Sequence, residues 1–194
     1  MEPIAGAGLQ RSLTWITSAN FAAFAIEVAV ARAIGSVSLL ADSAGFLTAA
    51  SVTLLALGLP RWSPRGRAIV GGACATFIIA CLLGALGMAL SKYRAPISPD
   101  PLVLSSVGAA ALAVQLLCAF IVAVHRRPVR PPIWTILVAA RYDVLVKVGI
   151  IETGVVTAFV WRAPWLDVIT GIALVVLNAD GAWRVWTAAR HPPR

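Results

Sequence analysis

The sequence has very little charge for its length. Only 12% of its 194 residues are charged, whereas a soluble domain usually carries about 25%. Cysteine is also scarce, and all three cysteines lie inside apolar segments without CxxC spacing: Cys74, Cys81 and Cys118. They are typical of small core residues rather than of metal ligands or disulfide partners. The scarcity of charge excludes a domain that is surrounded by water on all sides.

Catalytic motifs are missing as well. The sequence has no nucleophile paired with a base, no phosphate-binding loop and no HExxH pattern. We therefore expect no enzyme activity and no resident cofactor. The net charge of +8 would suit nucleic acid only if it formed a basic face. The basic residues instead stand in short clusters between apolar runs, so we expect no nucleic-acid partner.

Apolar residues are what the sequence has in abundance, at 60% of the chain. Six apolar segments reach about 20 residues or more, the length that a bilayer core of about 30 Å requires. They are residues 13–34, 37–59, 68–90, 102–124, 133–160 and 166–188. We predict an all-α membrane protein with a six-helix transmembrane domain over residues 13–188. A cytoplasmic segment, 1–12, is expected before it and a short cytoplasmic tail, 189–194, after it.

Lysine and arginine predict the orientation of these spans. One side of the membrane would hold Arg11, Arg61, Arg65, Arg67, Arg126, Arg127, Arg130, Arg184, Arg190 and Arg194, and the other Arg32, Lys92, Arg94 and Arg162. Because cytoplasmic loops are enriched in these residues, both termini are expected in the cytoplasm. All seven tryptophans lie close to a predicted helix end, as in interfacial aromatic belts. We expect a multi-pass protein of the cell (inner) membrane, in contact with the lipid bilayer.

Charged side chains inside the spans are the main indication of function, because a charge in hydrocarbon is costly and rarely kept without a use. They are Glu27, Asp42, Arg141, Asp143, Lys147 and Glu152, with Asp167 at the start of the last span. Each could line a cation or proton path, or pair with another charge to fix helix packing. Asp167 is expected near the external boundary, where water lowers the cost of its charge.

Three stretches resemble a known family. GSVSLLADSAGFLTAAS (35–51), DVLVKVGII (143–151) and WLDVITGIALVVLNADGAWRV (165–185) look like the membrane domain of cation diffusion facilitators, which export zinc and other divalent metals. The resemblance covers roughly residues 11–190 and includes Glu27 in the first helix. It implies the six-helix fold of that family and a function in cation efflux.

The family binds its metal in mid-membrane through two residues, four apart, on each of the second and fifth helices, and exchanges metal for protons. Carried onto this sequence, the resemblance assigns these positions to Gly45, Ala49, Ala139 and Asp143. Only Asp143 has a ligand side chain, so it is the one metal-ligand candidate. The family's soluble cytoplasmic domain is not expected after residue 194. A homodimer or a heteromer stays open.

Lys147, four residues after Asp143, suggests how the changed site could work. We hypothesise an Asp143–Lys147 pair in which the ammonium replaces the bound cation. Asp42 could pair with Lys147 or Arg141, attract cations, or relay protons.

Two functions therefore remain open. The first is a cation transporter, for a divalent metal or coupled to protons, with an altered or lost metal site. Its path candidates are Asp42, Asp143, Lys147, Glu152 and Glu27, and a divalent cation could be its substrate. The second is a non-transporting membrane scaffold or regulatory partner that keeps the fold.

Overall fold

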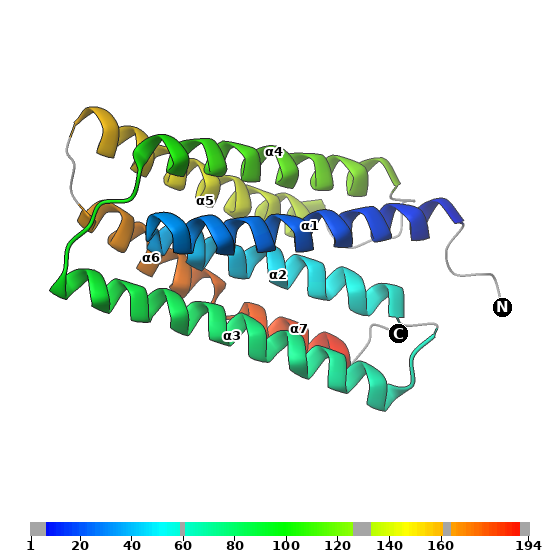
Figure 1. The fold of residues 1–194 in the computed structure, drawn as a ribbon. Helices are drawn as coiled ribbons and strands as arrows, with labels where there is room; N and C mark the ends of the chain where they lie inside the picture. The colour runs from blue at the N-terminus through cyan, green and yellow to red at the C-terminus, as the bar shows by residue number, and fades with distance from the viewer. Residues whose placement is uncertain (1–6, 59–60, 126–132, 161–163, 191–194) are drawn as a thin grey trace.

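The computed structural model describes residues 7–58, 61–125, 133–160 and 164–190, and within these ranges all side chains except those of residues 7, 9 and 122–144. The helices are α1 (Ala7–Ile34), α2 (Val37–Gly58), α3 (Pro64–Arg94), α4 (Pro101–His125), α5 (Ile133–Phe159), α6 (Pro164–Asn178) and α7 (Gly181–Arg190). The described ranges contain no strand, so the all-α prediction is confirmed. The helices form an elongated bundle in which α2 packs against α1, α3, α6 and α7, while α5 packs against α4 and α6 (Figure 1).

The bundle has the architecture of a multi-pass membrane protein. Among the described residues, five segments are long and apolar enough to cross a membrane: Gln10–Ile34, Val37–Gly58, Pro64–Arg94, Pro101–Ile121 and Pro164–Arg190. Helix α5 has 27 residues and is therefore about 40 Å long, which exceeds the thickness of a bilayer core. Six spans with both termini in the cytoplasm stay a prediction.

Helices α1 and α3 extend by four residues or more beyond the apolar segments that predicted them. Helix α1 begins at Ala7, inside the expected 1–12 segment, and α3 runs from Pro64 to Arg94. Helix α3 starts early because Ser63 caps it. Its hydroxyl accepts a hydrogen bond from Gly66 N at 3.1 Å, and Pro64 occupies a first-turn position where a missing N–H costs nothing.

The tight turn between α1 and α2 depends on a glycine. Gly35 has a φ of +67°, a left-handed conformation that costs a residue without a Cβ little. Ser36 N then donates to Ala31 O at 2.9 Å, which is the hydrogen bond of a Schellman-type helix end. The chain reverses direction within two residues, and α1 and α2 become an antiparallel hairpin. We call the end of the bundle that holds this turn the turn end.

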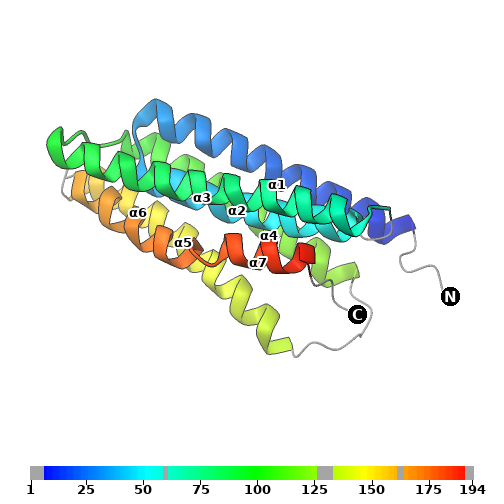
Figure 2. The same ribbon diagram turned by 90° about the horizontal axis from the view of Figure 1, so that it is seen from below.

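The last predicted span, 166–188, is broken into two helices. Helix α6 ends at Asn178 and α7 begins at Gly181. Asn178 Nδ2 donates to Ala41 O of α2 at 3.3 Å, and a Cβ on Gly181 would lie 2.5 Å from Thr48 Oγ1. Asn, Asp and Gly are poor helix formers, and here the break lets the chain lie close against α2. Figure 2 shows α7 continuing beyond α6 along α3 and α2.

Candidate functional site

A buried ion pair joins α2 to α5. Lys147 Nζ donates to Asp42 Oδ2, and the two residues are only 3% and 1% exposed. The Lys147 ammonium also lies over the ring of Phe46, 4.0 Å from its centroid. Phe46 follows Asp42 by one helical turn, so both project from one face of α2. A carboxylate and an aromatic ring therefore hold the same ammonium.

Glu27 brings a second carboxylate to this place from α1. It is 2% exposed, and it lies close enough to Asp42 and Lys147 to interact with both charges. Within the described part of the chain, neither of its carboxylate oxygens has a hydrogen-bond partner. We call Glu27, Asp42, Phe46 and Lys147 the charge cluster.

The charge cluster has two carboxyl groups and one ammonium. If both carboxylates were ionised, their charges and that of the ammonium would sum to −1, and an uncompensated charge away from water is strongly unfavourable. One proton or one monovalent cation would neutralise the cluster. The arrangement can therefore hold one further positive charge at the oxygens of Glu27.

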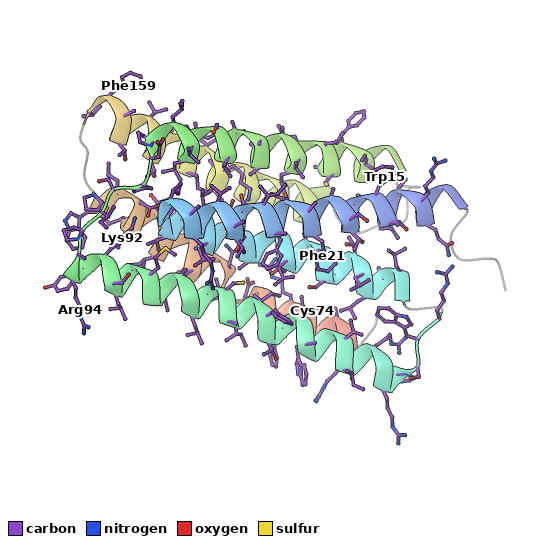
Figure 3. The ribbon with its side chains drawn as sticks, viewed as in Figure 1. Trp15, Phe21, Cys74, Lys92, Arg94 and Phe159 are labelled. Carbon is purple, nitrogen blue, oxygen red and sulfur yellow. The ribbon has the colours of Figure 1, made fainter. Side chains whose placement is uncertain are left out.

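Polar side chains continue from Glu27 along the same face of α1. Asn20, seven residues earlier, is 1% exposed, and its Oδ1 has no hydrogen-bond partner among the described residues. Its Nδ2 donates to Ile16 O at 2.7 Å. Nearer the N-terminus, Thr17 Oγ1 donates to Thr53 Oγ1 of α2 at 2.8 Å. This line of buried polar groups leads away from the turn end, toward the end that Trp15 marks in Figure 3.

A second buried charge group lies at the turn end, around Asp167. This residue is 0% exposed, so the expectation that water lowers the cost of its charge is wrong. Protein donors replace the water: Ser36 Oγ at 2.7 Å, Val37 N at 2.8 Å, Ser38 N at 3.1 Å, Ser38 Oγ at 2.6 Å and Lys92 Nζ at 2.8 Å. Figure 3 shows Lys92 at this end of the bundle. With every donor in place, the Asp167 group joins the α1–α2 turn to α3 and α6.

The remaining predicted site residues lie apart from the charge cluster or outside the described side chains. Glu152 is exposed on α5, because five residues after Lys147 correspond to a rotation of about 140° around the helix. The side chains of Ala139, Arg141 and Asp143 lie outside the described part. The Asp143–Lys147 pair is therefore untested, and Lys147 has Asp42 as its partner.

The family's ligand positions on α2 do not form a metal site. A Cβ on Gly45 would lie 3.3 Å from Asn178 Oδ1, so an amide from α6 occupies the space beside it. Among the described residues, no group of three or more His, Cys, Asp or Glu could hold a metal ion. The side chain of Asp143, the metal-ligand candidate, lies outside the described residues.

Sequence reasoning missed two participants, Phe46 and Lys92. The spacing of Phe46 from Asp42 was a readable signal, since residues four apart share a helix face. Lys92 was counted only as a residue that orients the membrane spans. Lys92 and Asp167 are 75 residues apart in the sequence, so no local pattern predicts their contact.

No protein-family model matches the chain, and no curated protein sequence matches it. The resemblance to cation diffusion facilitators therefore depends on its motifs alone.

Proposed function

We propose that this protein is a cation transporter of the cation-efflux type, in which the charge cluster exchanges a cation for protons. In this proposal the chain has six spans with both termini in the cytoplasm of a cell membrane. The observation that carries the proposal is the carboxylate of Glu27, which is almost fully buried, has no hydrogen-bond partner among the described residues and lies near another acid. Such groups inside membrane bundles mark ion or proton paths.

The cluster supplies the two states that a transporter needs. In one state Lys147 neutralises Asp42, as the ion pair between α5 and α2 indicates. In the other, a cation or protons neutralise the carboxylates and the ammonium is released. Because α1, α2 and α5 each contribute one charged residue, the occupant of the cluster affects how these helices pack. A change of occupant is thereby coupled to a change of access.

A second candidate is a non-transporting scaffold. The fully hydrogen-bonded Asp167 group favours it, because such a group can serve packing alone. In a scaffold the Asp42–Lys147 pair would likewise serve helix packing alone, and the protein would not need the carboxylate of Glu27.

Flux in proteoliposomes tests the proposal. Purified protein is reconstituted with a pH-sensitive dye inside the vesicles, and Na⁺, K⁺, methylammonium or Zn²⁺ is added outside. We expect a dye response to at least one cation that protein-free vesicles do not show, and its loss in Glu27→Gln. Glu152→Gln is the matched control, since it removes a carboxylate from the exposed face of α5 and should leave the response unchanged. A wild-type protein that is folded and inactive with all four cations would overturn the proposal and support the scaffold.

A further inference from the structure

The surroundings of the Lys147 ammonium have the composition of a binding site for an organic ammonium ion. Asp42 accepts a hydrogen bond from it, and the Phe46 ring lies under it at 4.0 Å. Both residues are 1% exposed. A carboxylate combined with an aromatic face is how proteins recognise alkylammonium groups, because the ring quadrupole attracts a weakly hydrated cation.

The same surroundings are poor for a divalent metal. Zn²⁺ takes four ligands and Ca²⁺ six or more, whereas the charge cluster supplies only the carboxylates of Glu27 and Asp42. The fixed ammonium of Lys147 also repels a metal ion. With both carboxylates ionised, one divalent ion would leave the cluster at +1, whereas one monovalent ion would neutralise it.

The Lys147 ammonium does not donate a hydrogen bond to every carboxylate oxygen of the charge cluster. An ammonium carries three N–H donors, but both oxygens of Glu27 are without a donor from the described residues. A small alkylammonium ion is not tethered to α5 and can place donors on both carboxylates at once. It would satisfy Glu27 as well as Asp42.

We propose that the charge cluster binds a monovalent alkylammonium cation between Glu27, Asp42 and Phe46, and that Lys147 is a tethered competitor for the same place. This inference rests on the proposed function for its role in transport, since it names the class of substrate. The binding itself does not depend on transport.

The first experiment removes the competitor. Lys147→Ala deletes three carbons and the ammonium, which together are n-propylammonium. The thermal unfolding of purified Lys147→Ala is measured with n-propylammonium, Na⁺ or Zn²⁺. We expect n-propylammonium to raise the Tm of this variant at concentrations at least about tenfold lower than for the wild type, because a tethered group competes at millimolar effective concentration.

The double variant Asp42→Asn/Lys147→Ala is the control for the carboxylate. It should lose the stabilisation by n-propylammonium. Equal stabilisation of the single and double variants would overturn the proposal, and so would stabilisation of Lys147→Ala by Zn²⁺ at lower concentration than by n-propylammonium.

A second pair of variants covers the case in which Lys147→Ala does not fold. Phe46→Leu keeps every charge, and Phe77→Leu changes a phenylalanine that is 64% exposed on α3. Methylammonium binding to each is measured by calorimetry. We expect Phe46→Leu to bind about 3- to 10-fold more weakly than the wild type, and Phe77→Leu to bind equally. Equal affinity in both variants would overturn the proposal. Binding without flux would leave this inference standing and contradict the proposed transport.

Discussion

Lys147 of α5 and Asp42 of α2 form an ion pair inside the helical bundle, where each is at most 3% exposed. Such a pair gains its attraction at a high cost in lost hydration, so its net contribution to stability can be small. Removing one partner is a different matter, because it leaves the other charge buried and unpaired. Stability and activity can therefore be separated experimentally at this pair.

Asp42→Leu alone should destabilise the protein by about 3–5 kcal/mol, since it leaves the Lys147 ammonium without its carboxylate. The double variant Asp42→Leu/Lys147→Met should return to within about 1 kcal/mol of the wild type while showing no flux. Denaturant unfolding in mild detergent measures both. A double variant as unstable as the single one would show that the charges themselves are needed for folding.

Glu27→Gln should leave the Tm unchanged or raise it. The amide has nearly the same shape as the carboxyl group, and it replaces a buried acid that lacks a hydrogen-bond donor among the described residues. Scanning fluorimetry checks this, with Glu152→Gln measured in parallel. A marked fall in the Tm of Glu27→Gln would mean that the carboxylate has a structural partner.

Asp167→Ala should be among the most destabilising substitutions in the chain, at about 3–5 kcal/mol. It leaves the Lys92 ammonium buried without its carboxylate and removes the acceptor for two N–H groups at the start of α2. Asp180→Ala is the matched control, because its pair with Arg184 is more than half exposed and such helical pairs contribute about 0.3–0.5 kcal/mol. Similar losses for both variants would contradict the assignment of Asp167 as a structural centre.

Gly171→Ala should separate α6 from the start of α2. A Cβ at this position would lie 2.4 Å from Val37 Cγ1 and 2.9 Å from Val37 C, and overpacking of this kind costs about 1–3 kcal/mol. Gly87→Ala is the control, because nothing lies within 4 Å of its added Cβ. The Tm of Gly87→Ala should be equal to or above that of the wild type. A Gly171→Ala protein as stable as Gly87→Ala would mean that this contact is loose.

The sequence predicted the helices better than their contacts. Long apolar runs defined the elements from α1 to α6, because length and apolarity are local properties of the chain. The break after Asn178 was not predicted, since it depends on contacts with α2 at Ala41 and Thr48. Periodicity in the sequence predicts which face of a helix a residue lies on. It does not predict which other helix packs against that face.

The same limit applies to the candidate site. Asp42 and Lys147 were both identified as charged residues in apolar spans, and Lys147 was one of the two bases considered for Asp42. The surroundings of Asp167 were misjudged, because its nearness to a helix end suggested water. Its donors come from the α1–α2 turn and from α3, which are distant in sequence. Only the arrangement of helices in space brings them together.

The turn at Gly35 and Ser36 also determines the relative depth of the two acids of the charge cluster. Glu27 lies seven residues before the end of α1 and Asp42 five residues after the start of α2, about 10 Å and 8 Å from the turn. Asp167 holds this turn through hydrogen bonds from Ser36 and Ser38. Glu27 and Asp42 therefore keep nearly the same depth along the bundle. Axial sliding of α5 would carry Lys147 past both of them, whereas neither acid could follow it.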